Sequence, residues 1–527
     1  MLMQLFSMFC FKCKVGKPDV ELVKNGTMIT VNQNCDQCGK KSFTWQSQPF
    51  MLGRYPAGNV LLSFGILTAG ASISKILLLF KHMGLAAYKA RTYFLHQREF
   101  LFPSVLHHWA NYKTLLTEEM KCKKEVTICG DARFDSMGHS AKYGAYTIFC
   151  TNLKKIVDFE LVQANETKGN SSQQMELLGL QRSIQKCIDS EVPVSQFVSD
   201  RHRGVAKWLR EEHPAIKHYF DIWHIARTLT KKLIKAGNEN NCQIINKWTA
   251  TIRNHLYWCA TSSKQGFSQL IIAKWKSIIN HIQDIHTHED PLFNTCIHQT
   301  FDQKRKWIKN GTTAFDKLKP ILLDTRLLND IRSISSDAQT SCLEAFHATL
   351  NHWHPKMIHY HWLGTKCRHI LEICHFNENL SRETMKTDDG QDILGVSFPK
   401  YKLGEEVVKP VPVPPTYDYV RTLRQILVSI SKEEMTTILA QHTSIAPKPL
   451  NSQFESRISK EEAKEKFRKR SFVITTLNPP AQQQKTMMEQ EAKKARGTEK
   501  KKTRKTGHCR TCGETMLGHS KQKCVSK

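Results

Sequence analysis

Three acidic residues have the types and positions needed to hold catalytic metal ions. Asp131 directly follows the apolar run Val126-TICG, and Asp200 ends a second apolar run, Phe197-VSD. If both runs are strands of one sheet, their ends can lie side by side, and two carboxylates held together favour a cation between them. With Glu344 as the third acid they can hold two Mg²⁺ (or Mn²⁺) ions about 3.5–4 Å apart. Such a pair activates a water or a 3′-hydroxyl and stabilises the leaving oxygen of a phosphodiester.

Each acid also has a purely structural explanation. Asp200 could cap the N-terminus of a helix that begins near Gly204. Asp131 could be a turn residue, and Glu344 could complete a capping box with Ser341. The order of the three acids on the expected elements favours metal binding over these alternatives.

Cysteine spacing predicts two structural zinc sites. Near the start, the pairs CFKC and CDQC are separated by 21 residues. Four thiolates complete a closed tetrahedral site, which supplies the fold of a segment too short for its own core. The expected ligands of this zinc ribbon are Cys10, Cys13, Cys35 and Cys38. Near the other end, CX2CX6HX4C predicts a zinc knuckle with the ligands Cys509, Cys512, His519 and Cys524.

The chain is strongly basic, and the excess is spread along it. Lys and Arg number 77 against 48 Asp and Glu, a net charge of +29. Residues 460–527 hold 19 basic and 7 acidic residues, so the rest of the chain is basic as well. This excludes a neutral enzyme with a basic tail and indicates a polyanionic partner, for which we expect double-stranded DNA. The run Lys493-KARGTEKKKTRK indicates a nuclear location, with a solvated tail as the alternative.

One segment, from Val60 to Lys81, is long enough to span a bilayer, which takes roughly 20 residues. Lys75 interrupts it, at a cost of about 2.5–3.5 kcal/mol on insertion scales. We therefore expect two buried helices that break near Gly70, and no membrane span.

The apolar pattern predicts the elements that must position the acids. Three β-rich runs begin at Glu125, Tyr143 and Ile156, with short polar turns between them, as in an antiparallel meander. The next elements are expected to be a helix over 172–190, a strand at 195–200, a helix over 204–212 and a strand over 217–223. This is the order of an α/β ribonuclease-H-like core.

Composition divides the chain into eight ranges. The first two ranges are expected to be a zinc ribbon (1–50) and a helical part (51–120), which includes a helix-turn-helix-like unit or is an ordinary helical subdomain. The core is expected in two parts (121–228 and 336–384), with an α-helical insertion between them (229–335). The remaining ranges are a linker (385–418), a helix with a basic tail (419–505) and the zinc knuckle (506–527).

Four blocks of sequence resemble the DDE transposases of cut-and-paste DNA elements. They are GDARFDSMGHSAKYGAYT from Gly130, VSDRHRGVAKWL from Val198, FDIWH from Phe220 and SCLEAFHATLN from Ser341. The chain looks most like the Kolobok-type group and more loosely like the Mutator-like group. The resemblance covers about residues 1–380.

The resemblance implies roles for several residues. The family's three catalytic acids match Asp131, Asp200 and Glu344. Asp221 and His224 match a [C/D]xxH element after the second Asp, and we expect them to position the strand end or the ligands, with direct catalysis as the alternative. Residues 225–335 match the insertion that many such enzymes carry before the Glu.

The first acid has a rival in Asp135, which lies four residues after Asp131. We favour Asp131 because it directly follows the apolar run. Position 132 is Ala where the family pattern has Gly, which would tighten the turn after Asp131.

Histidines are abundant, 24 in all, and they gather twice. In the expected insertion the spacing permits a metal site, although packing or DNA contacts explain it as well: His281, His286, His288, Cys296 and His298. A second group indicates metal binding less strongly: His347, His352, His354, His359 and His361.

These observations predict a nuclear, metal-dependent DDE transposase, or a host protein derived from one, that cuts DNA at element ends and joins it to a target. Joining two ends requires at least a dimer. Two alternatives stay open. One is a domesticated, non-catalytic DNA-binding protein that keeps the fold, and the other is a structure-selective nuclease without strand transfer.

Overall fold

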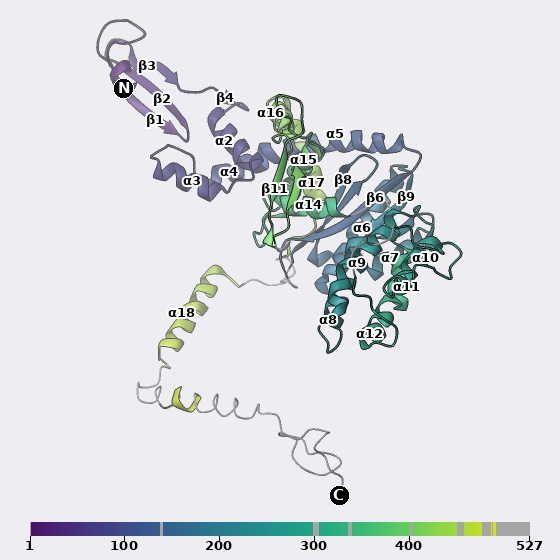
Figure 1. Ribbon diagram of the computed structural model, residues 1–527. Helices are drawn as coiled ribbons and strands as arrows, with labels where there is room; N and C mark the ends of the chain where they lie inside the picture. Colours follow the sequence, from purple (N-terminus) through teal and green to yellow (C-terminus); the bar gives the residue numbers. More distant parts are fainter. Residues whose placement is uncertain are drawn as a thin grey trace. The chain divides into compact units, whose positions relative to one another are not determined.

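The computed structural model (Figure 1) describes residues 2–137, 141–298, 305–335, 340–400, 404–450, 458–476, 486 and 488–491. The chain divides into two compact units, Met1–Leu450 and Asn451–Lys527. In the second unit, α18 (Lys460–Thr476) is the longest described element. The four predicted knuckle ligands and the basic run that begins at Lys493 lie outside the described residues.

A five-stranded mixed sheet forms the centre of the first unit, with the strand order β10-β9-β6-β7-β8. The strands are β6 (Val126–Phe134), β7 (Tyr143–Cys150), β8 (Lys155–Gln163), β9 (Val194–Ser199) and β10 (Lys217–Phe220). β6, β7 and β8 form the predicted antiparallel meander, and β9 and β10 run parallel to β6. The molecule is therefore a mixed α/β protein, as the pattern of apolar runs predicted.

Helices cover both faces of this sheet (Figure 1). They are α5 (Phe102–Lys121), α6 (Ser172–Asp189), α7 (Arg203–Glu212), α14 (Ser341–Thr349) and α15 (Trp362–Asn379). Ile128 of β6 belongs to the apolar cluster that includes Leu180 of α6. The next residue, Cys129, belongs to the cluster formed with Phe346 of α14 and Ile370 of α15. Because side chains alternate along a strand, α6 and α7 cover one face, and α14 and α15 the other.

A largely helical part lies between β10 and α14, where the insertion was predicted. Its helices are α8 (Ile222–Gly237), α9 (Ile244–Thr261), α10 (Ser268–Lys276), α11 (Ile278–His281), α12 (Thr313–Leu322) and α13 (Thr325–Arg332). They have an apolar core of their own, which contains Trp248 and Trp275. After α13 the chain returns to the sheet, because Ser335 donates its N–H to the carbonyl of Phe220.

The N-terminal part holds a separate three-stranded antiparallel sheet, β1 (Asp19–Asn25), β2 (Met28–Cys35) and β3 (Gly39–Gln46), after the short helix α1 (Leu2–Phe6). The hairpin of β4 (Phe50–Met51) and β5 (Tyr55–Pro56) leads to α2 (Ala57–Thr68), α3 (Ile73–His82), α4 (Ala90–His96) and the π-helical turn η1 (Gln97–Leu101). The expected break between the first two helices occurs at Gly70, which has a φ of +62°. The expectation that both helices are buried is wrong for α3, none of whose residues is buried. No helix among the described residues is both long and apolar enough to cross a membrane.

The range 385–418, predicted as a linker, contains the hairpin of β11 (Leu394–Ser397) and β12 (Val407–Pro410). It leads into α16 (Asp418–Ser429) and α17 (Lys432–Ser444). Leu423 and Leu427 of α16 are buried in the same apolar cluster as α5 and α15. The division of the chain into separate domains stays a prediction.

Two element boundaries differ from the sequence-based expectation. β6 does not end before Asp131 but continues to Phe134, because residues 131–134 pair with β7. β10 ends at Phe220, and Ile222 and Trp223 begin a helix instead of extending the strand. The helix forms because α8 buries an apolar stripe at helical spacing, from Ile222 to Leu233.

His218 in β10 should make the fold sensitive to acid. Burial lowers its pKa to about 4. The unfolded chain takes up this proton near pH 6.5 but the folded chain only near pH 4, so this contribution to stability is present above pH 6.5 and is lost as the pH falls towards 4. H218Q should remove this loss, which amounts to about 3 kcal/mol. The measurement compares the denaturant midpoints of wild type and variant between pH 7 and pH 4.5.

The matched control is H82Q, at an exposed position. Its midpoint should follow that of the wild type at every pH. Parallel profiles for H218Q and wild type would show that burial of His218 does not govern acid sensitivity.

Candidate functional site

Three aspartates lie in one row across neighbouring strands of the central sheet. In the parallel pairings, Gly130 of β6 lies opposite Ser199 of β9, which lies opposite Phe220 of β10. The next residue on each chain segment is an aspartate, so the row consists of Asp131, Asp200 and Asp221. Cys129, Val198 and Tyr219, two positions earlier, all pack into the cluster that includes α14 and α15. The three aspartates therefore belong to this face of the sheet.

His224, in the first turn of α8, lies at the centre of the acidic group. Its Nε2 atom is 2.9 Å from Asp200 Oδ1, 3.7 Å from Glu344 Oε1 and 4.0 Å from Asp221 Oδ2. Burial lowers the pKa of His224, but the hydrogen bond with Asp200 and the charges of the acids outweigh it and raise the net pKa. Asp200, Asp221 and His224 each offer a ligand atom within 4.8 Å of the others. The group could hold a metal.

Asp221 is the most deeply buried member, with 2% of its surface exposed. Its Oδ2 atom accepts a hydrogen bond of 3.0 Å from the hydroxyl of Thr340, just before α14. Its Oδ1 atom is buried without a hydrogen-bond partner among the described residues. Burial raises the pKa of Asp221. A buried carboxylate oxygen without a partner is costly unless a cation or a proton compensates it.

Glu344 reaches the group from the first turn of α14 and is 45% exposed. Burial raises its pKa, while His224 acts in the opposite direction. The capping box with Ser341 is wrong, because Ser341 already lies inside the helix and the N-cap residue is Thr340. Glu344 thus has no local capping role and points towards the acids of the sheet.

Asp131 lies beside the group, on β6. Its Oδ2 atom is 3.3 Å from Nδ1 of His347 on α14, and its Oδ1 atom accepts the backbone N–H of Ala132 at 2.8 Å. It is not a turn residue, because it pairs with Thr147 of β7 inside the strand. The structure therefore brings the three predicted acids to one face of the sheet, with His224 and His347 between them.

The N-cap alternative for Asp200 is also wrong. The N-cap residue of α7 is His202, whose Nδ1 accepts the backbone N–H of Val205 at 3.1 Å. The carboxylate of Asp200 is instead directed to His224.

Asp135 has a structural role in the same hairpin. Its Oδ1 atom accepts the backbone N–H groups of Lys142 at 2.9 Å and Tyr143 at 3.3 Å. Its carbonyl accepts the N–H of Met357 at 2.8 Å. Asp135 is buried and closes the β6–β7 hairpin, which favours Asp131 as the residue that faces the acidic group.

A buried arginine ties β6 to the end of α14. Arg133 donates from Nη2 to Asn351 Oδ1 at 2.7 Å and to the carbonyl of His354 at 2.8 Å. Burial lowers the pKa of Arg133 to about 10. These contacts fix α14, and with it Glu344, relative to the strand that carries Asp131.

A further carboxylate was missed by sequence analysis. Glu176 of α6 has a pKa raised to about 8, first by burial and then by the charges of Asp131 and Asp200. The sequence signal that could have indicated Glu176 is the helical spacing of the apolar residues around it. Met175 and Leu180 are buried on α6, and Glu176 lies next to this stripe.

The surface next to Asp200 is basic. Exposed side chains at helical spacing form what we call the α7 stripe: Arg203, Lys207 and Arg210. The opposite side of α7 buries Val205 and Leu209. Arg201 and Arg203 also line a cavity of about 360 Å³ together with Lys232 and Arg326.

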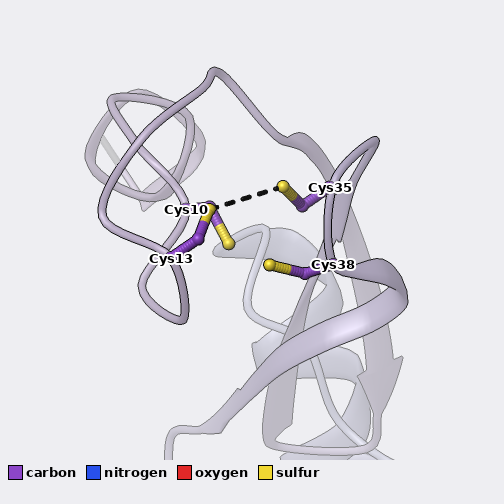
Figure 2. A group of neighbouring side chains, drawn as sticks. All are labelled: Cys10, Cys13, Cys35 and Cys38. Carbon is purple, nitrogen blue, oxygen red and sulfur yellow. Dashed lines mark hydrogen bonds between the residues drawn. The ribbon is translucent and has the colours of Figure 1, made fainter.

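The four N-terminal cysteines converge as the CxxC pairs predicted (Figure 2). Cys10 and Cys13 lie in the loop after α1, Cys35 ends β2, and Cys38 lies in the turn before β3. The Sγ atoms of Cys13 and Cys35 are 3.8 Å apart. All four ligand atoms lie within 4.8 Å of one another. This cluster fits a structural zinc site.

The pKa values of Cys10 and Cys38, one from each CxxC pair, are shifted in opposite directions. The backbone N–H of Cys13 lowers the pKa of Cys10 to about 6, against the opposing effect of burial. Hydrogen bonding with Cys13 raises the pKa of Cys38 to about 12. N–H groups directed at a cysteine sulfur stabilise the thiolate, which is the form that binds metal.

The two histidine groups have different structures. In the insertion, His281, His286, Cys296 and His298 come together, each with a ligand atom within 4.8 Å of the others. His288 contacts Cys296. The second group is dispersed: His347 contacts Asp131, His352 a backbone carbonyl, His354 Arg133 and His359 Tyr143, while His361 caps α15.

Comparison with solved structures gives a distant likeness. The chain is similar to a solved structure described as the Drosophila P element transposase strand transfer complex, with 12% sequence identity, a TM-score of 0.26 and coverage of 62% of this chain and 94% of that chain. No protein-family model and no curated protein matches the chain. A TM-score of 0.26 does not establish a shared fold, so the assignment of function rests on the chain's own residues.

Proposed function

We propose that this chain is a metal-dependent DNA transposase of the DDE type, with a ribonuclease-H-like core, that cuts and joins DNA at element ends. The observation that carries the proposal is the convergence of Asp200, Asp221 and Glu344 around His224, with Asp131 in the same row of the sheet on β6. The sheet order, three antiparallel strands followed by two parallel ones, supports the core assignment.

The acidic group fits a hard divalent cation. Carboxylate oxygens are the ligands that Mg²⁺ and Mn²⁺ prefer. The Oδ1 atom of Asp221 is buried without a hydrogen-bond partner among the described residues, and several acids lie near one histidine. The site therefore carries excess negative charge. Asp131, Asp200 and Glu344 would hold the ions. When bound, such ions lower the pKa of an attacking water or 3′-hydroxyl and stabilise the leaving oxygen of a phosphodiester.

The other residues of the site would position the ligands. Asp221 accepts from Thr340 and so links the end of β10 to the start of α14, which carries Glu344. His224 places its Nε2 atom 2.9 Å from Asp200 Oδ1 and forms an ion pair with this carboxylate when the ring is protonated. His347 lies beside Asp131, with its Nδ1 atom 3.3 Å from Asp131 Oδ2. We assign positioning roles to Asp221 and His224.

DNA binding would use the basic surface next to the site. The α7 stripe begins three residues after Asp200, on the helix that covers the other face of the sheet, so DNA bound at the start of the stripe would reach the acids past the end of β9. We further propose a nuclear location from the basic run at Lys493, and at least a dimer because two ends must be joined.

The test of the proposal is DNA cleavage by the full chain. The substrate is a duplex that carries the inverted repeats flanking the coding sequence in its genome, with Mg²⁺ or Mn²⁺, and with a chelator as control. Cleavage followed by joining to a target supports the transposase, and cleavage without joining supports a nuclease. Binding without cleavage under either metal would favour a domesticated, non-catalytic DNA-binding protein.

The α7 stripe should bind phosphates of the DNA backbone. A variant with K207Q and R210Q should bind DNA more weakly, and the slope of log K against log salt should fall by about 0.9 for each phosphate that the protein no longer neutralises. Thermal unfolding should be unchanged, since both side chains are exposed. The measurement is fluorescence anisotropy between roughly 50 and 300 mM salt, a range over which such binding weakens steeply.

A matched control replaces two exposed lysines on β12 and α17, with K409Q and K432Q. An identical salt slope for the α7 variant and this control would remove α7 from the DNA-binding surface.

A further inference from the structure

A second metal-binding geometry occurs in the helical insertion, away from the acidic group. His281 ends α11, and the chain then forms a short hairpin in which Thr287 pairs with Thr295 in an antiparallel bridge. The N–H of Cys296 donates to the carbonyl of His286 at 3.0 Å, so these two residues lie on neighbouring arms. Both arms and the end of α11 therefore deliver side chains to one place.

The side chains that meet there are those of zinc ligands. Cys296 Sγ lies 3.7 Å from Nδ1 of His281. The ring centroids of the three histidines are 4.8–5.3 Å apart: His281, His286 and His298. In a tetrahedral site with Zn–N of about 2.0–2.1 Å and Zn–S of about 2.3 Å, ligand atoms are roughly 3.3–3.8 Å apart. The group, with its ligand atoms within 4.8 Å of one another, is close to this geometry.

The surroundings add the contacts that typically accompany a bound zinc ion. Asp284 Oδ1 lies 3.1 Å from Nε2 of His286, so this ring can donate to a carboxylate while its other nitrogen faces the cluster. Carboxylates in this position orient a histidine ligand and increase its basicity. Nε2 of His288 lies 3.3 Å from Cys296 Sγ, where it can donate to a thiolate.

The side of the site that faces the helices is enclosed. His281 is 9% exposed, and its ring lies against Trp248 and Trp307. The cluster borders a cavity of about 490 Å³ that residues of α9 and α11 line.

We propose that His281, His286, Cys296 and His298 form a structural zinc site that fixes the 285–298 hairpin to the helical insertion. Three nitrogens and one thiolate select zinc over Mg²⁺ or Ca²⁺, which prefer oxygen. Four protein ligands leave no open position, which is typical of structural and not of catalytic zinc. This zinc site is independent of the proposed transposase activity, because neither the acids nor DNA take part.

The experiment measures zinc per chain by mass spectrometry in purified full-length protein. C296S and H298N should each lose one zinc equivalent, and the double variant should lose no more than one, because both act on the same ion. A C35S change in the N-terminal ribbon should lose a different zinc, so its loss should add to that of C296S. C122S and H82N, at exposed positions outside any cluster, should lose none.

A second measurement is limited proteolysis within residues 285–298. Chelation or H298N should speed cleavage there at least several-fold. Because His298 is exposed, H298N should fold even if C296S does not. A double variant with wild-type zinc content and wild-type cleavage of the hairpin would overturn the proposal, and so would zinc loss in the C122S control.

Discussion

Replacing Asp200 with Asn should abolish metal-dependent DNA cleavage while DNA binding survives. Loss of a ligand removes an ion and its stabilisation of developing charge, a loss of several kcal/mol. At 1.36 kcal/mol per tenfold, this corresponds to a rate about three orders of magnitude lower. D131N and E344Q should have the same effect. Asp200 and Glu344 are partly exposed, so the changes should be tolerated by the fold, and removal of a negative charge should tighten DNA binding slightly.

The matched control is D189N, which makes the same chemical change at an exposed position of α6. It should leave cleavage, binding and thermal stability as in the wild type. The measurement combines single-turnover cleavage with DNA-binding affinity and thermal unfolding for each variant. A D200N variant that cuts at the wild-type rate would remove Asp200 from the site.

The two positioning residues should behave differently from the three ligands. H224A and D221N should lower cleavage less, or should act through stability, because Asp221 is buried and bonded to Thr340. D135N should lower thermal stability, since Asp135 accepts two backbone N–H groups in the hairpin. If D135N abolished cleavage at unchanged stability while D131N cut normally, the first ligand would be Asp135.

The central sheet could be predicted from sequence because each strand is a short apolar run between polar turns. β7 is buried along its whole length, and its run from Tyr143 to Cys150 contains almost no polar residues. The end of β10 could not be predicted in the same way. Ile222 and Trp223 suit a strand or a helix, and only the buried stripe that continues to Leu233 decides for the helix.

The members of the acidic group were accessible to sequence reasoning, but its geometry was not. Asp131 and Asp200 follow apolar runs, which placed them at strand positions. The central place of His224 depends on the pairing register of β9 with β10 and on the start of α8 at Ile222. The contact between Asp131 and His347 joins residues 216 positions apart and has no local signal.

The spacing of cysteines and histidines can likewise indicate a zinc site without deciding which residues meet in it. Two CxxC pairs predict a four-cysteine cluster because each pair is a local unit. In the insertion, several assignments of ligands to His281, His286, His288 and His298 are compatible with the spacing. The bridge between Thr287 and Thr295 decides which side chains meet, because it sets the register of the two arms.

Replacing Cys35 with Ser should unfold the N-terminal ribbon and leave the central sheet intact. A structural zinc site contributes about 10–16 kcal/mol in zinc-finger peptides at neutral pH. Apart from the metal, the ribbon is held by a few buried residues and by ring contacts of Phe6 and Phe11 with Phe43. Within β1–β3, its buried apolar residues are Met28, Val31 and Cys35 itself. We expect the variant to lose one zinc equivalent, and amide exchange over residues 19–46 to rise to that of an unfolded segment.

The effect should stop at the next helix, because the ribbon and α2 share only a small polar connection. Asn59 of α2 accepts the N–H of Thr27 at 2.8 Å and donates to the carbonyl of Asn25 at 3.1 Å. The central sheet has its own clusters, with Ile128 and Ile148 fully buried. Exchange over residues 126–163 should therefore match the wild type, as it should throughout the chain in C122S. Unchanged zinc content and unchanged exchange over residues 19–46 in C35S would show that hydrogen bonds and packing, and not a metal, hold this sheet.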